Sequence, residues 1–213
     1  MAIIQQFLLD SIGSHFIAVT GSWGQDSAPY DGNSMSIDTK GRIYFPAYFR
    51  EDTSYPWLPN SGWIGQYSEF GKLNWQRAIG DSNATTYGDP SELLHDTTLS
   101  PDEQYLYVIG HDTGTSTGLI FKYDVNGNLQ WKKDCGDNNN NEFQGCVTDS
   151  SGNLYVVGSH TGGGNYRGFI VKFNSSGAIQ WQKIFGSSSR INFRHIAIDS
   201  SNNIYVTGSI DSG

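Results

Sequence analysis

The stretch DSSGNLYVVGS at residues 149–159 returns as DSSNNIYVTGS at residues 199–209, with eight of eleven residues identical. In both copies a group of Asp, Ser, Gly and Asn residues precedes a run rich in β-branched and aromatic residues. The first group suits a tight turn, and the run after it suits a β-strand. Because the motif recurs at a fixed distance, the sequence predicts one turn-plus-strand unit that the chain uses repeatedly.

The residues around each copy extend this motif to four short strands. One complete unit runs from Cys146 to Gly186: CVTD, the turn SSGN, LYVVG, a variable loop, GFIVKFN, the turn SSGA and IQWQKIFG. We place the units at about 35–80, 97–136, 146–186 and 195–213. A tandem four-stranded antiparallel unit of this length is typical of a β-propeller blade, whereas a two-sheet sandwich predicts no such periodicity.

The last strand of each complete unit carries a tryptophan, at Trp75, Trp131 and Trp181. From the two-residue period of a strand we expect Leu129, Trp131 and Lys133 to share one face.

These strand and turn motifs resemble the β-propeller repeat family (SBBP-like tandem repeats) typified by DSSGNIYVTG followed by KYDSSGNLQW. The resemblance covers most of the chain. It implies an all-β fold, a single propeller domain over residues 1–213 and about four blades. The segments IIQQFLL and HFIAVTG precede the first unit, so we expect residues 1–21 to complete the blade begun by residues 195–213 and thereby protect its edge strands. If the chain is a piece of a longer protein, the blade count is higher.

Composition and charge argue against two classes of partner. The net charge is −8, and the basic residues are scattered singly. Nucleic-acid binding needs a basic stripe, so we expect no nucleic acid. No apolar run approaches 18 residues, which argues against membrane insertion. The N-terminus lacks a basic region and its apolar run is interrupted by Gln5 and Gln6, so it does not read as a signal peptide.

The cysteines and histidines predict no metal site or cofactor. Cys135 and Cys146 stand where the next unit has Phe185 and Ile196. Two buried thiols are therefore favoured over a disulfide, although the loop between them leaves a disulfide open.

The five histidines, at 15, 95, 111, 160 and 195, show no HxH or HxxxH spacing. His111 and His160, which we assign to corresponding loops of adjacent units, would need a further ligand such as Asp112 to bind a metal. Exposed loop histidines are the favoured interpretation.

No catalytic group stands out in the sequence. GxSxG and Walker motifs are absent, and Asp96, Asp102 and Glu103 fall in turn-like sequence. We therefore expect no catalytic residue and a protein that is not an enzyme. An enzyme acting on carbohydrate in the propeller channel is an alternative, and it requires titratable side chains from different blades to converge.

Two connections depart from the repeated pattern. Residues 46–62 are dense in aromatic residues, and the loop before that unit adds two more. The candidate ligand- or partner-binding residues are Trp23, Tyr30, Tyr48, Phe49, Tyr55 and Trp57. Exposed aromatics suit stacking on sugar rings or anchoring a protein partner; the alternative is a satellite cluster beneath a long loop. Residues 81–97 form the second connection, in which DPSELLHD predicts a helical turn.

The family resemblance also suggests a biological setting. Units with SSG turns and IQWQ strands resemble segments of cyanophage-type virion structural proteins. We expect a tail- or fibre-associated virion protein in a symmetric oligomer, which docks to other virion proteins, binds a host surface glycan, or does both. The alternative is a fragment of a propeller adhesin at a bacterial cell surface.

Overall fold

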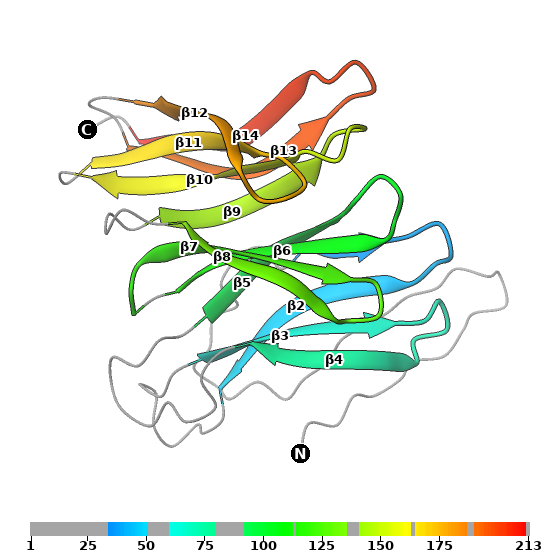
Figure 1. The fold of residues 1–213 in the computed structure, drawn as a ribbon. Coiled ribbons are helices and arrows are strands. Elements are labelled where there is room, and N and C mark those ends of the chain that lie inside the picture. Colours follow the sequence, from blue (N-terminus) through cyan, green and yellow to red (C-terminus); the bar gives the residue numbers. More distant parts are fainter. Residues whose placement is uncertain are drawn as a thin grey trace, which may run out of the picture.

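The chain forms only β-structure in the residues that a computed structural model describes: 34–50, 60–79, 92–112, 114–135, 141–162, 165–186 and 190–211. Three four-stranded antiparallel sheets and one two-stranded hairpin follow one another along the chain and stack side by side (Figure 1). In this part of the chain no helix is long and apolar enough to cross a bilayer. The predicted all-β fold of four-stranded antiparallel units is confirmed.

Each sheet is a meander in which consecutive strands pair. The first sheet contains β1 (Ser36–Ile37), β2 (Ile43–Arg50), β3 (Asn60–Tyr67) and β4 (Leu73–Ile79). The second contains β5 (Glu92–Leu99), β6 (Tyr105–Asp112), β7 (Thr117–Asp124) and β8 (Leu129–Cys135). The third contains β9 (Asn141–Thr148), β10 (Leu154–Gly162), β11 (Asn165–Phe173) and β12 (Ile179–Phe185), and the hairpin contains β13 (Arg190–Ile198) and β14 (Ile204–Asp211).

All the tight turns between strands at one end of the sheets share a geometry. Each begins with Asp, Asn or Ser, and its fourth residue has a positive φ. In the opening motif, Asp149 Oδ1 accepts hydrogen bonds from the backbone N of Ser151 at 3.0 Å and of Asn153 at 2.9 Å. Gly152 then adopts φ +80°, a conformation that costs a glycine little. The fourth residues are Gly41, Gly71, Glu103, Gly127, Gly152, Gly177 and Asn202.

The tryptophan of one sheet packs on the glycine turn of the next. A Cβ built on Gly127 would lie 2.7 Å from the Trp75 ring, and one built on Gly177 would lie 3.2 Å from the Trp131 ring. The indole N–H of Trp75 also donates to the Val125 carbonyl at 3.0 Å. The repeated residues therefore form turns and join sheets, which is why they recur.

A β-bulge changes which side chains share a face of the outer strands. Lys172 pairs with Trp181 whereas Phe173 pairs with Ile179, so Gln180 is an extra residue. Ile179 then lies on the opposite face from Trp181, and the same shift between Lys122 and Tyr123 separates Leu129 from Trp131. The expectation that Leu129, Trp131 and Lys133 share one face is therefore wrong, because a bulge interrupts the alternation.

Two apolar clusters form the core between sheets. One joins the first and second sheets around Tyr44, Ile64 and Phe121. The other joins the second and third around Ile109, Phe143 and Phe173. In the hairpin, Tyr205 and Ile210 are exposed by 57% and 69%.

The described strands do not close into a ring (Figure 1). The composite blade needs residues 1–21, which lie outside the described residues. The domain boundaries and blade number therefore stay predictions.

Candidate functional site

The sheets present two different ends. The tight turns lie at one end, and the connections that vary in length and sequence lie at the other, where strands β5, β9 and β13 begin. Variable connections on a uniform scaffold are the usual location of binding residues. The side chains nearest this end are therefore the candidates for a binding site.

The aromatic candidates stay predictions. Tyr48 and Phe49 belong to strand β2, which runs to Arg50, but the side chains of residues 47–50 are not described. Trp23, Tyr30, Tyr55 and Trp57 lie outside the described residues. Because β2 continues to Arg50 and β3 begins at Asn60, the connection is shorter than the predicted loop at 46–62.

A pair of buried histidines lies in the second sheet near this end. His95 is the extra residue of a bulge in β5, and its Nε2 lies 2.9 Å from Nδ1 of His111 on β6. The rings are stacked, with centroids 5.0 Å apart and planes 6° from parallel. The expectation of exposed loop histidines is wrong for these two, since both lie on strands and His95 is only 8% exposed.

Burial keeps both imidazoles neutral. It lowers the pKa of His95 to about 3, and the charges of His111 and Arg194 act in the same direction. Burial also lowers the pKa of His111, against the opposing effect of Glu142 and Asp112. At neutral pH one ring therefore donates an N–H and the other accepts it.

His160 does not join this pair. Its Nδ1 lies 2.8 Å from the side-chain oxygen of Asn141. The prediction that His111 and His160 lie in corresponding loops is wrong, because they lie on the corresponding strands β6 and β10. Since Gly110 and Gly158 hold equivalent places in these strands, His160 corresponds to Asp112. No group of three His, Cys, Asp or Glu side chains within the described ranges is arranged to hold a metal ion.

Asp96 connects several sheets. The prediction that Asp96 falls in a turn is wrong, because it lies within strand β5. The predicted helical turn at DPSELLHD is also wrong from Glu92 onward, because Glu92–Leu99 is a strand. Asp96 Oδ2 accepts a hydrogen bond from the backbone N of Cys146 at 2.8 Å, and Oδ1 accepts one from the backbone N of Thr97 at 2.7 Å. The Ser34 hydroxyl also donates to Oδ1.

Charges on the hairpin act on two residues of β5. Burial raises the pKa of Asp96, whereas its hydrogen bonds and the charge of His195 on β13 act to lower it. Arg194, also on β13, acts on His95. The hairpin therefore influences the protonation of Asp96 and His95 in the second sheet.

Glu92 adds a partly satisfied carboxylate at the start of β5. It pairs in register with Asp112, and burial raises its pKa. Its Oε2 is buried and has no hydrogen-bond partner. Asp102 and Glu103, by contrast, lie in the turn between β5 and β6, as predicted.

The two cysteines are free, as the favoured interpretation predicted. Burial raises the pKa of the Cys135 thiol to about 12. It raises the pKa of Cys146 as well, with Asp96 acting in the same direction. Both are therefore protonated at neutral pH and poor nucleophiles.

Comparison with known proteins supports the fold. Residues 180–213 match the beta-propeller repeat family SBBP. A comparison with curated proteins gave no match. Among solved structures, a gluconolactonase from Xanthomonas campestris is similar over 94% of this chain, with a TM-score of 0.50 and 16% identity. The β-propeller domain of the Trilobed protease from Pyrococcus furiosus is similar over 84% of this chain, with a TM-score of 0.43 and 11% identity.

The expectation that the chain is not an enzyme is corrected by this comparison, because the gluconolactonase, which is similar over 94% of this chain, is an enzyme. At 16% identity the likeness itself shows the fold alone. The chain spans 61% of that structure and 53% of the protease domain. It is a β-propeller protein built from tandem repeats, and its residues 180–213 carry the SBBP beta-propeller repeat.

Proposed function

We propose that this chain is a recognition platform that binds a host surface glycan through the end of the propeller that carries the variable connections. The observation that carries the proposal is the contrast between the two ends. The tight turns repeat one geometry, whereas the connections at the other end differ from unit to unit. Repeat proteins place binding residues in such variable connections.

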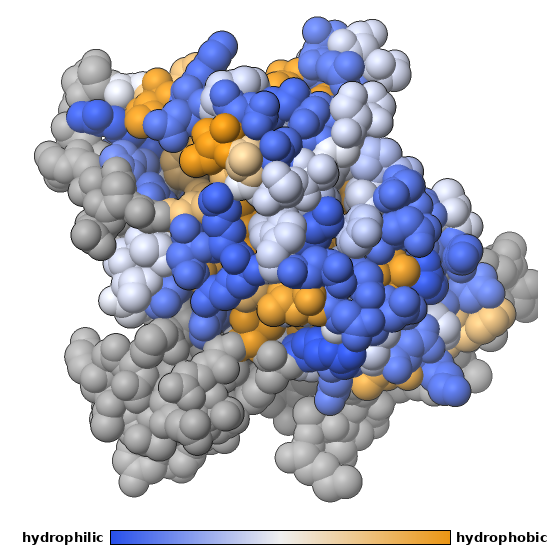
Figure 2. Space-filling model, viewed as in Figure 1, coloured by the Kyte–Doolittle hydropathy of each residue, from blue (hydrophilic) through white to orange (hydrophobic). Residues whose placement is uncertain are grey.

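The chemistry of this end suits a polar ligand. In the sequence, the connections at 22–33 and 51–59 carry aromatic residues together with Asp and Ser residues, whereas Glu92, Asp112 and His95 are buried. Figure 2 shows the sheets from the side, where hydrophilic residues predominate and hydrophobic ones form separate patches.

A glycan array tests this proposal. We expect Trp57→Ala to lose binding, because an aromatic ring that stacks on a sugar supplies much of the contact energy. Phe70→Ala is the matched control, since Phe70 is 68% exposed in a turn at the opposite end. Equal binding by both variants and the original chain would remove Trp57 from the site.

A virion tail or fibre is the proposed setting, with docking to other virion proteins in a symmetric oligomer. The family resemblance supports this setting. Intact mass and native oligomeric state test it: a symmetric assembly of full-length chains is expected. A monomer with a signal sequence encoded upstream of residue 1 would favour the cell-surface adhesin instead.

A second candidate function is an enzyme that acts on a small carbohydrate. The electrostatic effect of Arg194 on His95 and of His195 on Asp96 favours it, and a gluconolactonase shares the fold. The test is hydrolysis of gluconolactone by the original chain and by Asp96→Asn. Activity that falls at least about tenfold in the variant supports this function, and no activity above the uncatalysed rate contradicts it.

A further inference from the structure

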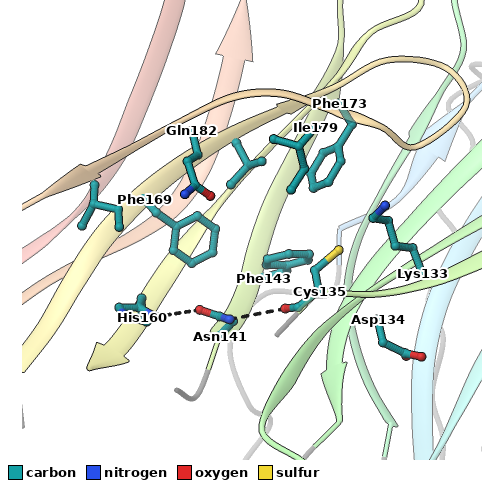
Figure 3. A pocket seen from close by; sticks show the side chains of 12 residues that line it. Lys133, Asp134, Cys135, Asn141, Phe143, His160, Phe169, Phe173, Ile179 and Gln182 are labelled. Carbon is teal, nitrogen blue, oxygen red and sulfur yellow. Dashed lines mark hydrogen bonds between the residues drawn. The ribbon is translucent and has the colours of Figure 1, made fainter. Parts of the chain in front are cut away.

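A cavity of about 410 Å³ lies between the second and third sheets, away from the buried histidine pair. Strands β8 and β12 form its outer walls, and strands β9 to β11 form its floor (Figure 3). The volume falls within the range of small-molecule sites, about 300–1,000 Å³. The floor is aromatic: Phe143, Phe169 and Phe173 are all at most 5% exposed.

Comparison with the preceding interface explains why the cavity exists. The strand registers place Val171 where the second sheet has Phe121, and Cys135 where the first sheet has Ile79. Phe121 and Ile79 are both buried in the core between the first two sheets. The smaller Val171 on the floor and Cys135 on one wall leave space that larger side chains fill in the other interface.

The floor shows the opposite trend, which makes it more aromatic. Phe143 and Phe169 stand where the preceding interface has Leu94 and Leu119. Their rings contact each other edge to face, with centroids 5.6 Å apart. The cavity therefore offers flat apolar surface to a ring or a branched aliphatic group.

Lys133 supplies a positive charge at one wall. Figure 3 shows its ammonium end extending toward Phe173, whereas Asp134 turns away from the aromatic floor. The Asp134 carboxylate lies 3.4 Å from Nζ of Lys132 instead. No ion pair with Lys133 is found among the residues that the structure describes, so its charge is available to an anion.

His160 supplies an acceptor at the opposite side. The Asn141 amide donates to the Cys135 carbonyl at 3.3 Å, which directs its oxygen toward His160 Nδ1 at 2.8 Å. This chain of bonds assigns the His160 proton to Nδ1. With the proton on Nδ1, Nε2 is the nitrogen that faces a ligand as a hydrogen-bond acceptor.

We propose that the cavity binds a small carboxylic acid with an aromatic or branched aliphatic body. The body packs on Phe143, Phe169 and Phe173, and the carboxylate pairs with the Lys133 ammonium. The proposal does not rest on the proposed glycan recognition, because the lining side chains belong to strands β8 to β12, although Cys135 and Asn141 flank one of the variable connections.

Calorimetric titration with phenylacetate and with its neutral isostere phenylacetamide tests the proposal. The original chain should bind phenylacetate at least about tenfold more tightly than phenylacetamide, because only the carboxylate pairs with Lys133. Lys133→Gln should abolish this preference. Lys183→Gln is the matched control, since Lys183 occupies the equivalent position on β12, and it should bind as the original chain does.

Two variants that fill the cavity test its location. Val171→Phe and Cys135→Ile each introduce the side chain found at the equivalent position of the preceding interface, and each should weaken phenylacetate binding at least about tenfold. They alter different sheets, Val171 on the floor and Cys135 on one wall, so one variant remains informative if the melting curve shows that the other does not fold. Phenylacetate binding that is unchanged in a folded filling variant, absent in the original chain, or no stronger than phenylacetamide binding would overturn the proposal.

Discussion

At the scale of single residues, the first residue of each tight turn organises the backbone. Asp149 accepts hydrogen bonds from two backbone amides and, through Oδ2, from the Tyr155 hydroxyl at 3.1 Å. Asp38 and Tyr44 repeat this hydroxyl contact at 3.2 Å. Burial raises the pKa of Asp149, but the hydrogen bonds from Asn153, Tyr155 and Lys172 outweigh it and the pKa is lowered.

We expect Asp149→Ala to lower the free energy of unfolding by about 2–3 kcal/mol, because two backbone amides and the buried Tyr155 hydroxyl lose their acceptor. Asp149→Asn keeps an acceptor oxygen, as Asn174 does in the other tight turn of the third sheet, and should cost less. Urea unfolding at pH 7 measures both. Equal losses in the two variants would contradict the role assigned to the acceptor.

The contribution of Asp149 also depends on pH. Its pKa is lower in the folded chain than in the unfolded chain, so the stabilisation is present above the unfolded value and is lost as the pH falls through the folded value. The difference in stability between the original chain and Asp149→Asn should therefore shrink in acid, as unfolding at pH 7 and pH 3 would show.

At the scale of elements, glycine turns and tryptophans join one sheet to the next. Gly152 and Gly127 have similar positive φ angles, +80° and +82°. A Cβ on Gly152 meets no atom within 4 Å, whereas one on Gly127 lies 2.7 Å from the Trp75 ring. The pair therefore separates backbone strain from contact between sheets.

We expect Gly152→Ala to cost about 1–2 kcal/mol, the penalty of a left-handed conformation. Gly127→Ala should cost more, because the methyl group also displaces Trp75. Thermal and urea unfolding measure the difference, and Trp75 fluorescence should shift only in the second variant. Equal costs would show that the Trp75 contact contributes nothing to stability.

The bulge in β5 makes one element sensitive to pH. The folded chain holds the pKa of His95 at about 3, below the ordinary value of about 6.5. Below pH 6.5 the unfolded chain therefore binds more protons, and the free energy of unfolding falls by up to about 1.4 kcal/mol per pH unit. The raised pKa values of Glu92 and Asp96 act in the opposite direction.

Replacing His95 isolates its effect. Gln144 occupies the bulge position of β9, so His95→Gln introduces a side chain that this backbone already accommodates. We expect the variant to lose less stability than the original chain between pH 7 and pH 4.5, measured by urea unfolding. Parallel pH profiles would show that His95 is not the group that titrates.

At the scale of the whole molecule, the repeat predicts the scaffold but not the sites. The predictions of the turns and of the strands after them are confirmed, because local residues specify these elements. Asp149 and Gly152, for example, form their turn through contacts within the turn itself. The sequence does not predict strand β5, because ELLHDTTL lacks the alternation of apolar and polar residues expected of a strand and follows a proline and a serine. Its neighbours on both sides override its local preference.

The histidine pair and the cavity could not be predicted from the sequence, for a different reason. The stacking of His95 on His111 depends on which residue of β5 the bulge leaves without a partner in β6. The cavity depends on the combined side-chain volumes of two sheets. Neither the bulge position nor the cavity volume can be deduced from the sequence of a single strand. One signal was available: Phe121 and Val171 differ in size at equivalent positions of repeated strands.

The composite blade gives a prediction at this scale. If residues 1–21 pair with the β13–β14 hairpin, deletion of these residues should accelerate amide hydrogen exchange in β14 and leave β6 unchanged, because exchange reports local opening. Strand β6 is a suitable reference, as most of its side chains are buried. Unchanged exchange in β14 after deletion would contradict the composite blade.

The contacts between sheets are arranged in series, so a pull along the stack would load each in turn. Between the first two sheets, Gln66, Trp75 and Arg77 all donate to carbonyls of the Val125–Gly127 turn. Between the next two, Lys122 is the only described side chain that makes the equivalent contact, to the Ser175 carbonyl; the Cys146 backbone N and the Thr148 hydroxyl also donate across this junction, and the cavity interrupts its packing. Under tension the second junction should rupture first, and an occupant of the cavity would raise the force it withstands.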